Sequence, residues 1–350
     1  MAQVEIVMAL YNKGATVERA IRSIRQQSLS DWRLIVVDDG STDEGPARAA
    51  ALGDARIELV RQENRGPGAA RNAGLARAAS PLVSFLDADD EWYPWFLEEA
   101  AGALGNERVG MAVTPFYYWP SGQDIRATWA RQGIFPGEYL VGEDADPAWV
   151  NRLRKAPWVG NVVLRTELAR RCGGFYEKDR CVVGEDSTFF FRVVFNAVFA
   201  ILERPAARYH LESSVLGYYS GRGVQAPPYL QDPSTVLEYC DAARRGLMER
   251  VLDHEALMVA HLWARAGRKA EATALLAARP GVRAYGTAYW RCRYELLVSR
   301  WLPRWVRFKC AVGPPVRRWL RRRLACRSAA EAPPAMPDEQ PAPTAGHKDS

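Results

Sequence analysis

Cysteine is scarce in this chain of 350 residues, and its six copies are spread without a single C-x-x-C pair. That spacing argues against a zinc site or a disulfide framework, and reduced thiols are typical of the cytosol. No uninterrupted apolar run approaches about 20 residues, the length needed to cross a bilayer. The basic leading segment of a signal peptide is also missing. We therefore expect a protein of the cytoplasm.

Two common nucleotide-binding motifs are missing as well. Neither G-x-G-x-x-G nor the P-loop pattern follows the first apolar stretch, Val4 to Leu10. Their absence argues against a dinucleotide site and against phosphate binding by a glycine-rich loop. If the protein binds a nucleotide, a metal ion must do more of the work at the phosphates.

The overall composition is that of an ordinary globular protein, with 48% hydrophobic and 25% charged residues. Its net charge of +6, however, is not spread evenly. Residues 300–327 contain ten Lys or Arg and no Asp or Glu, so the rest of the chain is net acidic. The length suits one sizeable domain with an appendage.

The first ninety residues alternate short apolar stretches with segments of helical character. The apolar runs predict strands at 4–10, 32–37, 56–60 and 82–86, and further strands are expected at 109–116 and 161–165. Strands that alternate with helices favour right-handed βαβ units. We therefore predict an α/β fold with a Rossmann-like, mostly parallel central sheet flanked by helices.

Carboxylates gather where two of these strands end. Asp38 and Asp39 follow the second strand, and Asp87, Asp89 and Asp90 follow the fourth. The carboxyl ends of parallel strands meet at one sheet edge, where ligands bind, and closely spaced carboxylates repel one another unless a cation lies between them. Oxygen ligands suit Mg²⁺ or Mn²⁺. A solvated acidic turn that caps the next helix is the alternative interpretation of this D-x-D motif.

Four stretches, in this order, resemble a known family. They are Tyr11-Asn12, VVDDGSTD at 36–43, ENRGPGAARNAGLARA at 63–78 and FLDADD at 85–90. Together they resemble the donor-binding half of the inverting family 2 glycosyltransferases with the A-type fold. The resemblance covers about residues 3–215. It implies an enzyme of the hexosyltransferase type with Mn²⁺ or Mg²⁺ as its cofactor.

The resemblance gives several residues a role in binding the nucleotide-sugar donor. Tyr11 would flank the base, and Asp39 would accept a hydrogen bond from its N3–H, which favours uracil. Asp38 would orient the loop or the ribose, Asp87 would contact the ribose, and Asp89 would bind the metal between the two phosphates. The remaining positions that match donor contacts are Leu10, Asn12, Asn64, Arg71 and Ala88. The alternative interpretations are that Tyr11 is an amphipathic residue at a strand end and that Arg71 is a surface arginine.

The acceptor side has its own candidates. Gly184, Glu185 and Asp186 precede a predicted buried helix at 189–196, and a carboxylate there is usually a helix cap. By the resemblance, Asp186 would instead be the general base for the acceptor hydroxyl, which Glu185 would orient. One in-line displacement then inverts the anomeric carbon. His210 matches a position near the metal in some relatives, although an ordinary loop histidine is the alternative.

We divide the chain into four parts. Residues 1–215 are the expected catalytic domain, with a nucleotide-sugar half at 1–108 and an acceptor half at 109–215. A helical subdomain at 216–299 is the C-terminal appendage. Residues 300–327 form a basic amphipathic segment, and the proline-rich residues 328–350 form a disordered tail.

The basic segment suggests a membrane surface as a partner. Val316, Leu320 and Leu324 recur at helical spacing with Trp319 beside them, among many arginines. This composition is typical of an interfacial helix on anionic lipid. Nucleic acid is the competing partner, because basic residues interleaved with aromatics also suit its backbone. We favour a peripheral protein on the inner face of the cell membrane, since such transferases often use lipid-linked acceptors.

These observations predict a metal-dependent inverting glycosyltransferase. The donor would be a UDP-linked sugar and the acceptor a hydroxyl of a saccharide or lipid-linked molecule, in bacterial surface polysaccharide or glycan biosynthesis. One alternative is a metal-dependent nucleotidyltransferase, which also uses paired carboxylates but needs no acceptor base. The other is a catalytically inactive scaffold that binds nucleotide sugars.

Overall fold

The computed structural model describes residues 2–213, 226–298, 334 and 336, which contain two β-sheets. The larger sheet has eight strands in the order β3-β2-β1-β4-β10-β6-β11-β9. Its strands are β1 (Val4–Leu10), β2 (Trp32–Asp38), β3 (Ile57–Arg61), β4 (Leu82–Phe85), β6 (Val109–Val113), β9 (Gly137–Tyr139), β10 (Val162–Arg165) and β11 (Val198–Ile201). The smaller, four-stranded sheet has the order β5-β12-β7-β8. It consists of β5 (Glu91–Trp92), β7 (Phe116–Trp119), β8 (Gln123–Asp124) and β12 (Ala207–His210).

The sheet is parallel in the first ninety residues, as the alternating pattern predicted, and β11 also runs parallel to β6. Strand β1 runs parallel to both β2 and β4, and β3 runs parallel to β2. Strand β10, however, is antiparallel to β4 and β6, and β9 is antiparallel to β11. The central sheet is therefore mixed, because a buried strand has the same apolar pattern in either direction.

Helices cover both faces of this sheet, which explains the continuous apolar run in β2. Ile35 and Val37 pack with Ala70 of α3 (Pro67–Arg77), whereas Leu34 and Val36 belong to the main core. That core also contains apolar residues of α1 (Val17–Arg25) and α4 (Phe96–Ala103). Close packing of α3 on β1 requires Gly74, because a Cβ there would lie 2.3 Å from Val7 Cγ1.

One predicted strand is in fact two. The expected strand at 109–116 divides into β6 and β7, with Thr114 and Pro115 between them. Proline has no N–H to donate to a ladder, so it interrupts the strand. Strand β7 then pairs with β12 in the second sheet, which the sequence did not predict.

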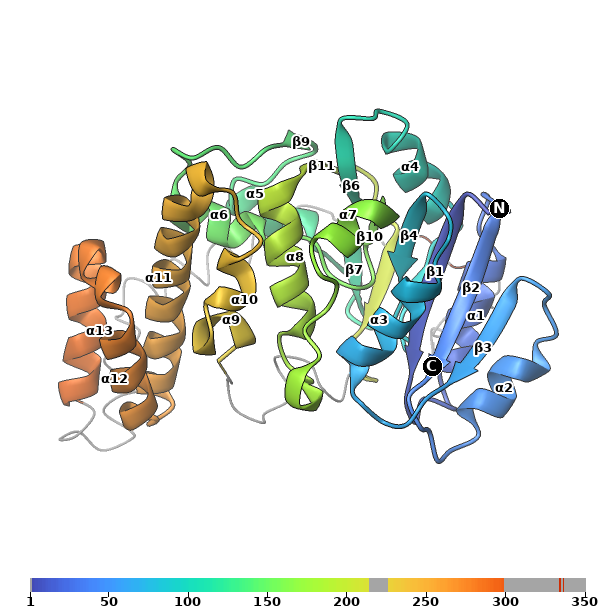
Figure 1. Ribbon diagram of the computed structural model, residues 1–350, viewed down its shortest axis with the longest axis horizontal. Coiled ribbons are helices and arrows are strands. Elements are labelled where there is room, and N and C mark those ends of the chain that lie inside the picture. Colours follow the sequence, from blue (N-terminus) through green and yellow to red (C-terminus); the bar gives the residue numbers. More distant parts are fainter. Residues whose placement is uncertain (1, 214–225, 299–333, 335, 337–350) are drawn as a thin grey trace, which may run out of the picture.

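The remaining helices belong largely to the second half of the chain. They are α2 (Gly45–Ala51), α5 (Arg126–Arg131), α6 (Pro147–Leu153), α7 (Thr166–Arg171), α8 (Glu185–Asn196), α9 (Pro228–Gln231), α10 (Ser234–Leu237), α11 (Ala242–Arg265), α12 (Lys269–Ala278) and α13 (Gly286–Val298), with short 3₁₀ helices at Lys178–Arg180 and Pro280–Tyr285. Helices α11, α12 and α13 lie at the end of the molecule farthest from β3, so the predicted helical appendage is confirmed (Figure 1). A buried ion pair between Glu255 of α11 and Arg154, which follows α6, joins it to the body. The domain boundaries themselves stay predictions.

Most of the predictions for the C-terminal region concern residues outside those described. The whole basic segment 300–327 is among them. Within the predicted tail, the Pro334 carbonyl accepts a hydrogen bond from Arg208 at 3.0 Å, and Met336 packs with Tyr93 and Tyr117. Among the helices that the structure describes, none is both long and apolar enough to span a membrane.

Candidate active site

The acidic turn after β4 places three carboxylates together. Asp87, Asp89 and Asp90 each offer an oxygen, and these oxygens lie within 4.8 Å of one another. A turn with a hydrogen bond from the Asp90 N–H to the Asp87 carbonyl, 3.1 Å long, draws them together. Asp89 and Asp90 are buried, whereas Asp87 is partly exposed.

This carboxylate cluster fits a divalent cation. Asp90 Oδ2 is buried and has no hydrogen-bond partner among the described residues, while Oδ1 accepts from the His210 backbone N–H at 2.8 Å. Burial and the charges of Asp89 and Asp87 raise the pKa of Asp90 well above its usual range. Three oxygen donors that repel one another are a suitable ligand set for Mg²⁺ or Mn²⁺. The predicted D-x-D motif is thus a candidate metal site.

Two basic side chains reach this turn, Lys13 from the residues just before α1 and Arg19 from α1 itself. Lys13 forms an ion pair with Asp89, and its ammonium also donates to the Ser213 carbonyl at 2.8 Å. Arg19 donates to the backbone carbonyl of Asp89 at 2.6 Å. Neither residue was predicted as part of the site, because these contacts join positions 76 and 70 residues apart.

Asp39 is the residue predicted to bind the nucleotide base. Its side chain accepts hydrogen bonds that link the end of β2 to the loop before α3. Its Oδ1 accepts from Gln62 Nε2 at 2.8 Å and from the Arg65 N–H at 2.9 Å, and its Oδ2 accepts from the Gly66 N–H at 2.9 Å. A carboxylate has about four lone-pair positions, so it can accept one further hydrogen bond from a ligand. Asp38 accepts from the Ser41 N–H at 2.8 Å and is buried. This hydrogen bond agrees with the predicted role of Asp38 in orienting the loop after β2. That role stays a prediction.

The other predicted donor residues occupy the same edge. Tyr11 is 47% exposed at the end of β1, where its ring is accessible for stacking. Asn12 has a positive φ of 51° and accepts from the Thr42 N–H at 2.9 Å. Leu10 and Ala88 are buried and Asn64 is partly buried, so Tyr11, Asn12 and Asn64 are the residues of these five with accessible side chains.

Arg71 is not a surface arginine. It is buried in α3 and donates to Asp87 Oδ1 at 2.7 Å and to Glu185 Oε1 at 2.9 Å. Its guanidinium also lies over the Phe175 ring, 5.2 Å from the ring centre. One cation therefore connects the acidic turn of the predicted donor half with the predicted acceptor half.

Asp186 lies in the first turn of α8, next to Glu185. Gly184 caps this helix in the left-handed region with a φ of 88°. Burial and the charge of Glu185 raise the pKa of Asp186 to about 7, against the opposing effect of Arg71. A carboxylate with a pKa near the working pH is suited to act as a general base.

His210 ends β12 and is buried, so it is not a loop histidine. Its Nε2 lies 2.6 Å from Glu91 Oε2, and its Nδ1 lies 2.6 Å from Glu212 Oε1. In this arrangement both ring nitrogens are occupied by carboxylates. Metal binding by His210 stays a prediction, and it would require one of these contacts to open.

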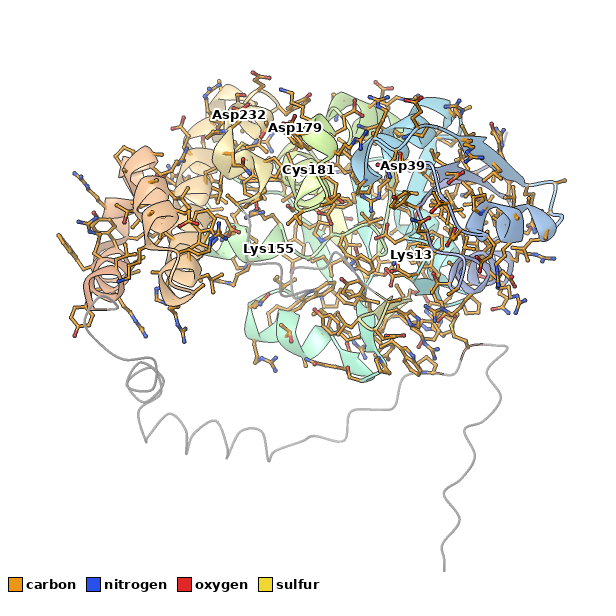
Figure 2. The ribbon with its side chains drawn as sticks, turned by 90° about the horizontal axis from the view of Figure 1, so that it is seen from below. Lys13, Asp39, Lys155, Asp179, Cys181 and Asp232 are labelled. Carbon is orange, nitrogen blue, oxygen red and sulfur yellow. The ribbon has the colours of Figure 1, made fainter. Side chains whose placement is uncertain are left out.

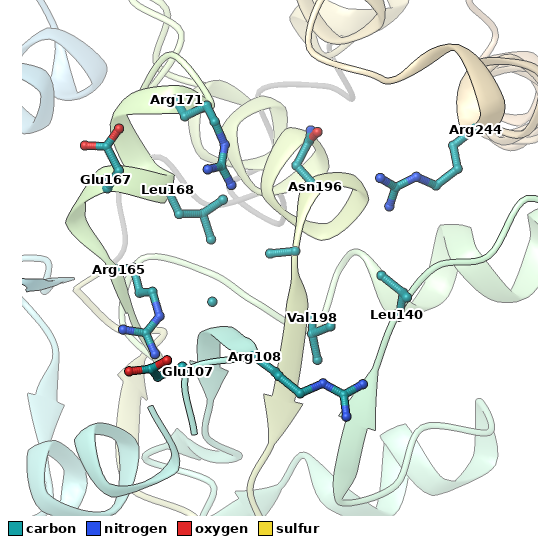
Figure 3. Close-up of a pocket in the computed structure, with 12 residues that line it drawn as sticks. Glu107, Arg108, Leu140, Arg165, Glu167, Leu168, Arg171, Asn196, Val198 and Arg244 are labelled. Carbon is teal, nitrogen blue, oxygen red and sulfur yellow. The ribbon is translucent and has the colours of Figure 1, made fainter. Parts of the chain in front are cut away.

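The candidate site extends over one edge of the molecule. Lys13 and Asp39 lie over the N-terminal half (Figure 2). None of the predicted site residues lines the cavity of about 440 Å³ in Figure 3. That cavity lies where β6 and β11 begin and β10 ends, which is the opposite edge of the sheet. Its lining includes Arg108, Arg165, Arg171 and Arg244.

Comparison with known proteins relates part of the chain to a family. Residues 5–151 match the model described as Glycosyl transferase family 2. Succinoglycan biosynthesis protein ExoO from Rhizobium meliloti is 44% identical over 92 residues, which are 26% of this chain and 26% of that protein. UDP-Glc:alpha-D-GlcNAc-diphosphoundecaprenol beta-1,3-glucosyltransferase WfgD from Escherichia coli is 37% identical over 90 residues, 25% of this chain and 36% of that protein. The matches thus span about a quarter to a third of these relatives.

Solved structures extend the likeness of the fold to most of the chain. S. aureus TarS 1-349 in complex with UDP superposes with a TM-score of 0.56 at 15% sequence identity. The superposition covers 85% of this chain and 91% of TarS 1-349. At this identity the likeness concerns the fold alone. The matched model places residues 5–151 in glycosyltransferase family 2, and the superposition shows the A-type glycosyltransferase fold over most of the chain.

Proposed function

We propose that this protein is a metal-dependent inverting glycosyltransferase of bacterial exopolysaccharide biosynthesis. It transfers a sugar of the hexosyl type from a UDP-linked donor to a hydroxyl of a saccharide or lipid-linked acceptor. The observation that carries the proposal is the bridge made by Arg71 between Asp87 and Glu185. This bridge holds the acidic cluster and the candidate base on one edge, as a single displacement between donor and acceptor requires.

The relatives support the finer parts of the proposal. ExoO is named for succinoglycan biosynthesis, and the name of WfgD specifies a UDP-linked glucose and a diphosphoundecaprenol-linked acceptor. The TarS structure contains UDP. These names describe those proteins, and they favour a UDP-sugar and a lipid-linked acceptor here.

Each group at this edge has a chemical task in the proposed reaction. Asp87, Asp89 and Asp90 would hold the divalent cation, which supplies Lewis-acid stabilisation of the departing diphosphate when it is bound. Asp186 takes the proton from the acceptor hydroxyl as the oxygen attacks the anomeric carbon. Arg71 fixes Glu185, which orients the acceptor beside that base. A nucleotidyltransferase would not need a dedicated base for an acceptor hydroxyl, which is the role proposed for Asp186.

Release of UDP from a panel of UDP-sugars tests this function. With saccharide and lipid-linked acceptors and Mn²⁺, we expect acceptor-dependent release from at least one UDP-sugar. Chelation with EDTA should lower that rate by about a hundredfold or more, because the leaving diphosphate loses its stabilising cation. Release of sugar 1-phosphate in place of UDP would indicate the nucleotidyltransferase, because attack on the α-phosphate of a UDP-sugar expels that group, and no turnover would indicate the inactive scaffold.

We further propose that the protein binds the inner face of the cell membrane through the basic segment 300–327. Deleting residues 300–350 should lower binding to phosphatidylserine vesicles to the level seen on neutral phosphatidylcholine, because each Lys or Arg near an anionic surface contributes about 1 kcal/mol. Vesicle sedimentation measures the bound fraction. A second variant keeps Pro334 and Met336. In this variant Gln replaces five arginines, namely Arg317, Arg318, Arg321, Arg322 and Arg323. Unchanged binding of both variants would refute the membrane proposal.

A further inference from the structure

Lys13 places a positive charge inside the candidate metal site. Its ammonium forms an ion pair with Asp89 and donates to the Ser213 carbonyl at 2.8 Å. The side chains of Lys13 and Asp89 are only 24% and 12% exposed, so the pair is largely shielded from water. A shielded charge pair interacts more strongly than one on the surface.

The neighbouring cations are committed to other groups. Arg71 pairs with Asp87 and Glu185, and Arg19 contacts the backbone carbonyl of Asp89 and the Glu91 carboxylate. Among the described residues, Lys13 is therefore the cation that pairs with the Asp89 side chain.

Lys13 and Arg71 together leave this cluster short of positive charge, because Arg71 is shared with Glu185. Three carboxylates share the turn, and the buried Asp90 Oδ2 lacks a hydrogen-bond partner within the described part of the chain. A divalent cation carries twice the charge of Lys13 and can contact several of these oxygens at once. Lys13 and such a cation would compete for the same carboxylate oxygens of Asp89.

The backbone of Lys13 is fixed, whereas its side chain can turn. Its carbonyl accepts from the Thr16 and Val17 N–H groups at 3.0 and 2.9 Å, which anchors the residue at the start of α1. The flexible four-carbon stem can still carry the ammonium to another anion nearby. At this edge, the diphosphate of a bound donor would be such an anion.

We propose that Lys13 is an internal counter-cation that couples metal binding to binding of the donor diphosphate. Without nucleotide, Lys13 neutralises Asp89 and weakens metal binding. When both ligands bind, Lys13 leaves Asp89 and pairs with the diphosphate, so each ligand strengthens the binding of the other. The inference rests on the proposed function, since it requires a cation and a nucleoside diphosphate at this edge.

Mn²⁺ titrations of the full chain test the proposal, with free Mn²⁺ followed by electron paramagnetic resonance, in the presence and absence of UDP. The variant Lys13→Met removes the charge and keeps much of the apolar stem. We expect it to bind Mn²⁺ without UDP about tenfold more tightly than the wild type, because a competing cation is gone. The enhancement of Mn²⁺ affinity by UDP should fall by a similar factor.

Three further variants make the result specific. Lys155→Met is the matched control, because Lys155 pairs with Glu255 away from this edge, and it should bind Mn²⁺ as the wild type does (Figure 2). Lys13→Arg keeps the charge and should retain the coupling, and Lys13→Gln replaces Lys13→Met if that variant does not fold.

The titrations also separate this inference from the proposed function. If the wild type binds Mn²⁺ together with UDP but the neutral Lys13 variants show the same affinities, the role of Lys13 is wrong and the function stands. If neither the wild type nor the variants bind Mn²⁺, both proposals are overturned.

Discussion

Asp186→Asn is expected to abolish sugar transfer and to leave UDP binding unchanged. The amide keeps the size of the side chain but cannot accept the proton of the acceptor hydroxyl. General-base catalysis contributes about 10²- to 10⁴-fold, and we expect a loss of the acceptor-dependent UDP release rate within that range. Calorimetric titration with UDP in the presence of Mn²⁺ measures the retained binding.

Asp179→Asn is the matched control for this substitution. Asp179 is exposed in the loop before α8 and has a positive φ of 56°, which asparagine tolerates well. It should therefore transfer sugar at the wild-type rate. Normal transfer by Asp186→Asn, in contrast, would show that Asp186 is not the base.

The dependence of the rate on pH gives the same assignment a second test. Because burial and Glu185 raise the pKa of Asp186 to about 7, its basic carboxylate form predominates only above that pH. The wild-type rate should rise with pH through about 7 and then level off. Below this pH it should fall about tenfold for each unit, since the fraction of carboxylate falls by that factor.

Asp89→Ala is expected to remove the effect of Mn²⁺ on UDP binding. The substitution deletes one of the three clustered carboxylates and the partner of Lys13. We expect kcat/KM to fall by about 10³-fold or more, because the leaving diphosphate would lose its cation. Titrations with UDP, with and without Mn²⁺, measure the lost enhancement directly.

A second aspartate serves as the control for that loss. Asp144 is exposed in the loop before α6, so Asp144→Ala should keep both the Mn²⁺ enhancement and the rate. If Asp89→Ala still bound UDP more tightly with Mn²⁺, the metal assignment would have to move to other residues.

The sequence predicted the elements whose pattern is local. Strands β1, β2 and β4 are mainly apolar because helices cover both faces of the sheet, and the acidic residues at the ends of β2 and β4 are adjacent to those strands in the chain. Strand direction is not local: the run at 162–165 gave no sign that β10 is antiparallel to its neighbours. The smaller sheet was missed for a similar reason, since β5 and β8 have two residues each.

The candidate site likewise has one part that is local in the sequence and one part that is not. Asp87, Asp89 and Asp90 were predicted as a cluster because they are adjacent in the chain. The contacts that organise the cluster join distant residues: Arg71 meets Glu185 across 114 positions, and Glu91 meets His210 across 119. The first contact depends on the packing of α3 beside α8 and the second on the pairing of β5 with β12, and no short motif encodes either arrangement.

Calorimetric titration with UDP, GDP and CDP, each with and without Mn²⁺, tests the central claim most directly. We predict selective binding of UDP that Mn²⁺ strengthens, because the proposed hydrogen bond to Asp39 would favour uracil and the proposed metal site would hold a cation beside the diphosphate. Selective binding of GDP or CDP would contradict the base assignment, and no binding of any nucleotide would contradict the proposed donor site as a whole.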